Sequence, residues 1–220
     1  MPTLRGQCKS GALGAYAKVA VGVRGGGSLD NLTQVCFSQK LKSKEKTIRS
    51  VLFLPPRVVK DDSADAGKEE DSEEIKSSTV GLVSDALRKR GWQVDGSAAS
   101  RQALTSDSKR SALVDYLRAR QVNLFDQIAN RPQDIAKGRY SLGEEAAGLG
   151  TDAGTDALVF VQSYSYSRWA ERQMSMRISF ADPRSGEVLC YVRIGPTGLP
   201  KRLSRENRIE RILKQLQKIP

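Results

Sequence analysis

The chain has 220 residues, of which 39% are hydrophobic, and this is enough for one domain of ordinary size with a buried core. Its net charge of +11 is unevenly distributed, because Met1–Ser50 carries nine Lys and Arg against two acids. Most of the positive excess therefore lies near the start of the chain and is only a weak indication of nucleic-acid binding. The sequence has no histidine and three widely spaced cysteines, which excludes serine–histidine and cysteine–histidine catalysis, and we predict no catalytic residues, no metal site and no cofactor.

The first 47 residues are predicted to be a basic, disordered tail. They are rich in Gly, Ser and Lys, include the triplet Gly25–Gly27, and show no sustained helical or strand period. The nearest candidate for a signal peptide, Tyr16–Val23, is interrupted by Lys18 and Gly22. Residues 48–220 are predicted to form a single α/β domain.

The domain begins with a strand, a helix and a second strand. Ser50–Pro56 is an apolar run closed by two prolines, which is typical of a buried strand. After an acidic loop, the apolar residues from Ile75 onward predict a helix that stops at Gly91. Trp92–Val94 then predicts a short second strand.

Two helical segments follow. Ser106 or Asp107 is a suitable cap for a helix that runs towards Arg131, in one piece or as two helices. The second segment, Ser141–Leu149, opens with the capping-box pattern of Ser141 and Glu144.

The remaining sequence predicts a meander of three strands and a closing helix. Ala157–Val161 is unbroken in its apolar character, as expected for a central strand that is covered on both faces. Residues 174–181 and 188–194 predict a hairpin, with Asp182–Gly186 as its turn. The whole pattern predicts an α/β (α+β) fold with a mixed sheet of about five strands in the order β-α-β-α-α-β-β-β-α, ending in a C-terminal amphipathic helix.

One candidate interaction surface lies between the first two strands of the meander. Its aromatic and arginine residues are of the types enriched at protein interfaces, although nucleobase stacking and ordinary edge packing are alternatives. The residues are Tyr164, Tyr166, Arg168, Trp169 and Arg172.

A second candidate is the basic face of the last helix, which carries Arg205, Arg208, Arg211 and Lys214. Such a face either binds phosphate or anionic lipid, or is simply solvated. Three acids lie near the strand ends: Asp152, Asp156 and Asp182. A pair of such carboxylates could catalyse glycoside hydrolysis if they converged in a cleft, but Asp is also an ordinary turn residue.

The order of elements and four segments resemble a known family. The segments are VLFLPP (51–56), VSDALRKRGWQV (83–94), TDALVFVQ (155–162) and ISFADPRSGEVLCYVRIG (178–195). Together they look like the small periplasmic domains of bacterial envelope lipoproteins, a group that includes the curli secretion lipoprotein and the amino-terminal domain of the Tol-system propeller protein. The resemblance implies a non-enzymatic module that assembles with itself or with other envelope proteins.

Family members usually begin with a signal peptide and a lipid-modified cysteine. In this chain the sequence from Leu32 to Cys36 partly matches such a site, without the apolar segment before it. We therefore expect a periplasmic or outer-membrane location if an upstream signal peptide is missing from this chain, and a cytoplasmic location otherwise.

Two functions follow as hypotheses. The first is a non-catalytic envelope assembly or scaffold domain, with envelope proteins, further copies of itself or an anionic membrane surface as partners. The alternative is a basic cytoplasmic α/β protein that binds nucleic acid or nucleotide, although nucleic acid is the less expected partner.

Overall fold

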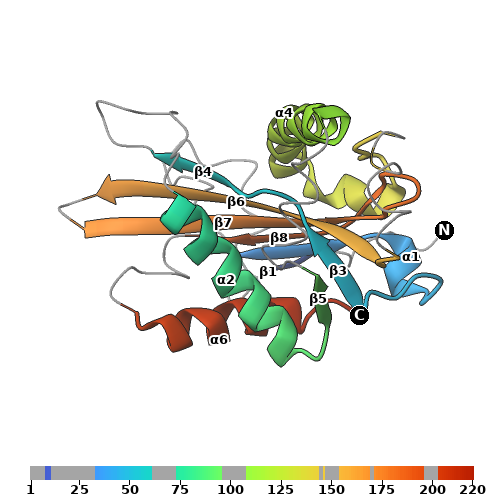
Figure 1. Cartoon of the computed structure of the whole chain (residues 1–220). Helices are drawn as coiled ribbons and strands as arrows, with labels where there is room; N and C mark the ends of the chain where they lie inside the picture. The colour runs from blue at the N-terminus through green and yellow to red at the C-terminus, as the bar shows by residue number, and fades with distance from the viewer. Residues whose placement is uncertain are drawn as a thin grey trace, which may run out of the picture.

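An eight-stranded mixed sheet forms the middle layer of the computed structural model, with helices on both of its faces (Figure 1). The structure describes residues 8–10, 33–60, 73–95, 108–143, 146, 154–168, 171–195 and 203–220. The strands are β1 (Cys8–Ser10), β2 (Gln34–Phe37), β3 (Ser50–Phe53), β4 (Arg57–Lys60), β5 (Gln93–Asp95), β6 (Ala157–Arg168), β7 (Glu171–Ala181) and β8 (Val188–Ile194). The helices are α1 (Gln39–Lys42), α2 (Glu73–Lys89), α4 (Ser108–Asn130), the 3-10 helix η3 (Pro132–Lys137) and α6 (Arg205–Leu216).

The long strand β6 organises the sheet. The strand order is β1-β2-β8-β7-β6-β3-β5, and β4 pairs with β6 as well. β3 and β4 run parallel to successive parts of β6, so that Leu52 pairs with Leu158 and Val58 with Ser163. Pro55 and Pro56 separate β3 from β4, because proline has no N–H for the ladder. The predicted first strand is confirmed, but its continuation as β4 was missed.

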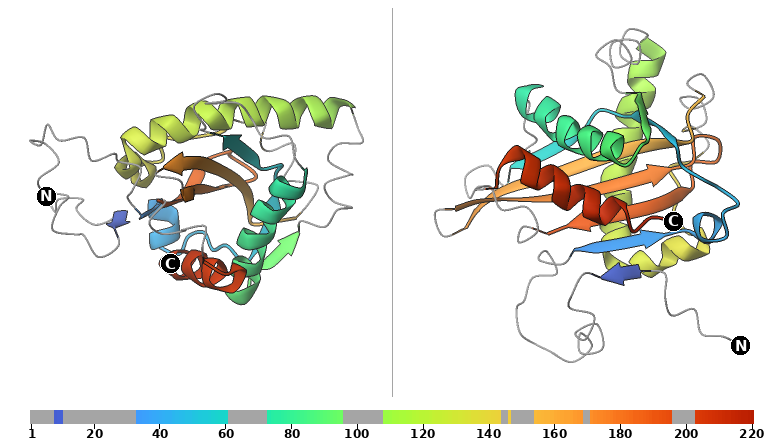
Figure 2. Two further views of the ribbon diagram at one scale, coloured as in Figure 1. Left: turned by 90° about the vertical axis from the view of Figure 1, so that its left-hand side faces the viewer. Right: turned by 90° about the horizontal axis from the view of Figure 1, so that it is seen from below.

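Two hydrophobic cores lie on opposite faces of the sheet. Figure 2 shows the helices that cover these faces, α2 and α6 on one side and α4 on the other. Along β6, Val159 and Val161 belong to the core shared with α2 and α6, whereas Leu158 and Phe160 belong to the core shared with α4 and η3. Successive residues of a strand point to opposite faces, so a strand that is covered on both sides must be apolar throughout. The prediction of a central, doubly covered strand from Ala157 to Val161 is therefore confirmed.

The predicted α/β class, the mixed sheet and the C-terminal amphipathic helix are also confirmed. The strand count of about five is too low, since the sheet has eight strands. The missed strands are β1, β2 and β4, which have three or four residues each. Segments this short do not show a periodicity that distinguishes them from loops.

The predicted boundary between tail and domain is wrong for residues 34–46. β2 pairs antiparallel with β8 through Val35 with Val192 and Cys36 with Tyr191. Val35, Cys36 and Phe37 are buried, and so is Leu41 of α1. The sheet therefore begins before Ile48, and the rest of the predicted tail, apart from residues 8–10, 33 and 47, lies outside the described residues.

The helix predictions have mixed outcomes. α2 ends where expected, with Gly91 in the left-handed conformation at φ +89°. α4 is one helix of 23 residues rather than two. Ser141 does not begin a helix, because it forms an isolated bridge with Glu187 and its Oγ accepts a hydrogen bond from the Gly143 N–H. Most of the predicted helix after Ser141 lies outside the described residues.

The β7–β8 turn has the predicted chemistry. The Asp182 carboxylate accepts a hydrogen bond from the Arg184 N–H at 2.8 Å, and the Gly186 N–H donates to the Asp182 carbonyl at 2.9 Å. Gly186 has φ +68°, which is the left-handed conformation that favours glycine.

The cysteines have two different roles. Cys190 is a free and fully buried core residue. Cys36 is disulfide-bonded. Cys8 is the residue opposite Cys36 in the pairing of β1 with β2. Because Cys36 is buried and bonded within the sheet, the folded chain does not present it as a site for lipid attachment.

We expect peptide mapping without reduction to recover Cys8 linked to Cys36. Cys190 should resist an alkylating reagent until the protein is unfolded, because burial both hides the thiol and raises its pKa. Mass spectrometry of the alkylated native protein measures both properties. Native labelling of Cys190, or an unmodified Cys36 thiol in protein purified without reductant, would contradict this assignment.

Candidate functional site

The two longest strands form a hairpin that projects beyond the rest of the sheet (Figure 1). β6 and β7 stay paired out to Arg168 and Glu171, whereas the outermost pair between β7 and β8 is Met176 with Ile194. On its other side, β6 pairs with β4 only as far as Ser165. Among the described residues, the outer end of the hairpin therefore has no neighbouring strand.

Most of the predicted interaction residues belong to this projecting hairpin. Tyr164, Tyr166 and Arg168 lie in β6, Arg172 lies in β7, and Trp169 lies outside the described residues. Of these side chains, the structure describes only that of Tyr164. Arg177 Nη1 donates to the Tyr164 hydroxyl at 3.3 Å, and its guanidinium lies 4.9 Å from the ring centroid. Tyr164 is therefore packed against a cation at the base of the hairpin, and the role of the other four residues stays a prediction.

The structure also reveals polar residues under α4 that the sequence analysis did not select. Arg177 forms an ion pair at 3.1 Å with Asp126 of α4. Its neighbours across the strands are Gln162 on β6 and Arg193 on β8, both of which are buried. Arg177 alternates with apolar residues in β7, a pattern that is typical of a solvent-facing position. In the structure α4 covers this face. The alternation correctly identifies the residues that share a face, but it does not show that a helix covers them.

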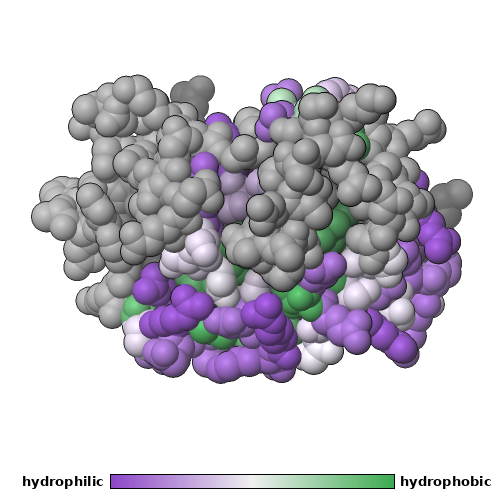
Figure 3. All heavy atoms as spheres, viewed as in Figure 1, coloured by the Kyte–Doolittle hydropathy of each residue, from purple (hydrophilic) through white to green (hydrophobic). Residues whose placement is uncertain are grey.

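The predicted basic face of α6 is only partly a surface feature. Arg205 is exposed, and its Nη2 donates to Asp85 of α2 at 2.7 Å, so this residue also joins the two helices. Arg208 is half-buried, and its Nε atom is buried without a hydrogen-bond partner. Arg211 and Lys214 are exposed on the helix. Hydrophilic residues gather along this side of the molecule, over α6 (Figure 3).

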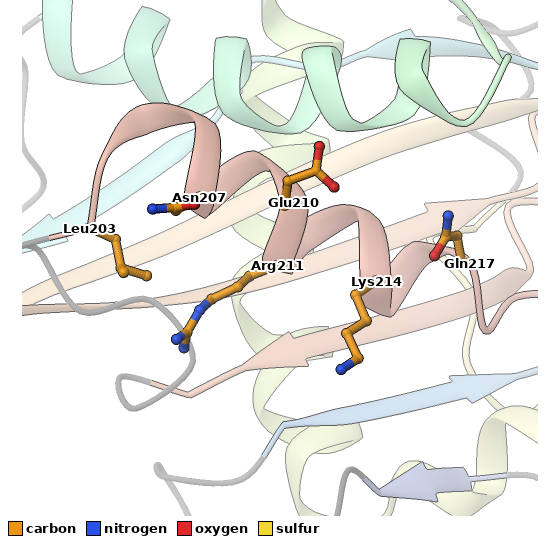
Figure 4. A pocket seen from close by; sticks show the side chains of 6 residues that line it. All are labelled: Leu203, Asn207, Glu210, Arg211, Lys214 and Gln217. Carbon is orange, nitrogen blue, oxygen red and sulfur yellow. The ribbon is translucent and has the colours of Figure 1, made fainter.

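An open depression runs along the outer surface of α6. Figure 4 shows Glu210 pointing towards α2, and Arg211 and Lys214 pointing away from α2. Glu210 forms an ion pair with Lys89 of α2. The depression is lined by Leu203, Asn207, Glu210, Arg211, Lys214 and Gln217. It is shallow and mixed in charge, and the described part of α6 does not offer a concentrated cationic site.

The acids considered for hydrolysis are engaged in structural contacts. The Asp156 carboxylate accepts three hydrogen bonds, from the Arg49 N–H, the Ser50 N–H and the Ser50 hydroxyl, at 2.9 to 3.1 Å. Partial burial of this carboxyl acts to raise its pKa, but the hydrogen bonds outweigh that effect and the pKa is lowered. Asp182 holds its turn and pairs with Lys46 at 3.3 Å. Asp152 lies outside the described residues.

No family model matches the sequence, and a search of curated proteins finds no match. The solved structures that are similar to this chain include the following three. The lipoprotein GNA1162 from Neisseria meningitidis is 14% identical with a TM-score of 0.39, over 77% of this chain and 96% of that one. PelC from Paraburkholderia phytofirmans, solved as a dodecamer, is 9% identical with a TM-score of 0.41, over 79% and 91%. The C-terminal domain of LpoB from Salmonella enterica is 16% identical with a TM-score of 0.33, over 71% and 93%.

The first of these proteins is described as a lipoprotein. Every TM-score is below 0.5, so a function for this chain has to rest on its own residues. Within the described ranges, no helix combines the length and the apolar content that crossing a membrane requires.

Proposed function

We propose that this protein is a non-catalytic assembly domain of the bacterial cell envelope, which binds envelope proteins or further copies of itself through the β6–β7 hairpin. The observation that carries the proposal is the extension of β6 and β7 beyond their neighbouring strands. A projecting two-stranded ribbon has backbone N–H and C=O groups along its outer edges, which are ready to pair with another chain.

The sequence of the hairpin supports this proposal. Tyr166, Arg168 and Arg172 lie at its outer end, and Trp169 follows Arg168 in the sequence. Tyr, Trp and Arg are the residue types that dominate binding energy at protein interfaces. The acids that would be needed for hydrolysis, Asp156 and Asp182, are occupied by backbone, turn and lysine contacts instead.

The disulfide-bonded Cys36 supports a location in the periplasm or at the outer membrane. Disulfides form and persist in oxidising compartments, which include the bacterial periplasm, and are rare in the cytoplasm. The proposed location in the periplasm or at the outer membrane therefore rests on the disulfide-bonded Cys36, which is independent of the hairpin.

The test is a double variant of the hairpin, Tyr166→Ala with Trp169→Ala. We expect the wild-type protein to form an oligomer in size-exclusion chromatography with light scattering, or to crosslink to a defined envelope protein. The double variant should lose that species while it keeps its melting temperature, because residues at the end of a projecting hairpin contribute little to the core.

Tyr116→Ala is the matched control, since Tyr116 is an exposed aromatic residue on α4, with 42% of its surface accessible. It should behave as the wild type does. A strictly monomeric protein without an envelope partner, or equal loss of binding in the control, would refute the proposal. A salt-dependent shift with generic DNA would instead favour the nucleic-acid hypothesis.

A further inference from the structure

A row of polar residues crosses the sheet beneath α4, and the proposed hairpin function does not use it. The residues are neighbours in the strand register: Arg57 pairs with Gln162, Gln162 with Arg177, and Arg177 with Arg193. Paired positions share one face of a sheet. That face is the one under α4, because Phe160 and Tyr191, each two residues from a member of the row, belong to the core that includes α4.

Two side chains on this face are buried without hydrogen-bond partners, Gln162 in the row and Tyr191 two residues from Arg193. Gln162 has 1% of its surface exposed, and neither its Oε1 nor its Nε2 has a partner. The hydroxyl of Tyr191 is fully buried and also lacks one. Buried polar groups are nearly always satisfied in folded proteins, and an unsatisfied one marks a place for a water, an ion or a ligand. Here two such groups lie on the same face of adjoining parts of the sheet.

The charges at the row favour a negative ligand. Arg177 and Arg193 are direct cross-strand neighbours, and Arg57 lies on the other side of Gln162. The ion pair of Arg177 is with Asp126, whose side chain is 65% exposed. A largely exposed carboxylate of α4 therefore already contacts the Arg177 guanidinium. Burial raises the pKa of Tyr191 to about 12, so its hydroxyl keeps its proton and is able to donate it in a hydrogen bond.

We propose that the row under α4 binds an oxyanion, in the form of a carboxylate or a phosphate group. Arg177 and Arg193 supply the charge, and the Gln162 amide and the Tyr191 hydroxyl supply hydrogen-bond donors that have no other partner. Guanidinium groups suit both anions because their N–H groups match pairs of oxygens. Asp126 occupies the outer side of Arg177 and competes with the ligand.

The test measures the melting temperature of the full chain in sodium phosphate and in sodium acetate, each compared with sodium chloride at equal ionic strength. We expect a concentration-dependent rise in at least one of the two, and the stronger response identifies the preferred anion. Arg177→Gln should weaken the apparent affinity by about tenfold, because it removes a charged donor. Asp126→Asn should strengthen the affinity, because it removes the competing carboxylate.

Gln162→Leu separates a binding role from a purely structural one. It should raise the melting temperature in sodium chloride, because an unsatisfied buried amide is lost, and it should abolish the response to the anion. This variant also keeps the test decisive if Arg177→Gln fails to fold. Lys214→Ala is the control, since it removes one exposed cation from α6 on the opposite face of the sheet and should leave the response unchanged.

Two results would overturn the proposal. One is a wild-type protein that responds to phosphate and acetate no more than to chloride. The other is a Gln162→Leu variant that responds as the wild type does, which would mean that water alone fills the row and that any anion binds elsewhere. Because the hairpin double variant leaves the row intact, its anion response should equal that of the wild type whether or not hairpin binding is confirmed.

Discussion

Gly186→Ala is expected to destabilise the protein by about 2–5 kcal/mol. Gly186 has φ +68°, a conformation that costs an L-residue about 1–2 kcal/mol. A Cβ at this position would also lie 2.2 Å from the Gly143 carbonyl oxygen and 3.0 Å from its nitrogen. Both are backbone atoms, so they cannot rotate away, and relieving the overlap adds about 1–3 kcal/mol of strain. Thermal or urea unfolding, followed by circular dichroism, measures the loss.

Gly154→Ala is the matched control. Gly154 has φ +59°, but a Cβ there would meet no atom within 4 Å, so only the conformational cost should apply. We expect this variant to lose about 1–2 kcal/mol. If the two variants lose the same free energy of unfolding, the close approach between the β7–β8 turn and Gly143 does not contribute to stability.

The contact of Gly186 with Gly143 also shows what the sequence was able to predict. The turn itself was predictable, because Asp182, Pro183 and Gly186 each have a local preference that defines it. Its docking partner was not, because that contact joins segments that are far apart in the chain. The segment that begins at Ser141 was predicted as a capped helix, whereas Ser141 forms a bridge to Glu187 beside this turn.

The error at β2 has a different physical cause. Val35 and Phe37 belong to the core with α2 and α6, and Cys36 belongs to the core with α4. A strand of four residues that is buried on both faces has no alternation to detect, and here it follows a Gly-rich and Lys-rich segment. Only the pairing with β8 identifies it as a strand.

The polar row under α4 was missed for a related reason. Arg177 and Ser179 alternate with Ile178 and Phe180, which predicts a strand with one solvated face. Alternation shows which residues share a face, but not what covers that face. In this fold α4 covers it, so Arg177 becomes a partner of Asp126 instead of a solvated cation.

The two ends of the β6–β7 hairpin differ in their contacts. At the end near the β7–β8 turn, Asp182 pairs with Lys46 and Glu187 pairs with Lys40, which fixes the sheet to the segment around α1. Asp156, just before β6, lies at this same end, because Leu158 of β6 pairs with Ala181 of β7. The opposite end is the projecting part with the proposed interaction residues. We therefore expect substitutions at one end to change stability and substitutions at the other to change the proposed binding.

Asp156→Ala should cost about 3 kcal/mol in the free energy of unfolding, without any effect on binding at the hairpin. It removes the acceptor of three hydrogen bonds and leaves the N–H groups of Arg49 and Ser50 without that partner. Hydrogen bonds to a charged group contribute about 1.5–3 kcal/mol each, and their loss is not additive within one cluster. Urea unfolding at pH 7 measures the change, and Asp85→Ala, which breaks an exposed ion pair, should cost less than about 1 kcal/mol.

The contribution of Asp156 should also depend on pH in a defined direction. The pKa of this carboxyl is lowered in the folded protein, so folding favours its ionised form. Its stabilisation is then complete above the unfolded pKa of about 4 and is lost as the pH falls through the folded value. The difference in unfolding free energy between the wild type and Asp156→Asn should be constant from about pH 7 to 5 and should shrink below about pH 4. A difference that stays constant down to pH 2 would show that the charge of Asp156 does not stabilise the junction of β3 and β6.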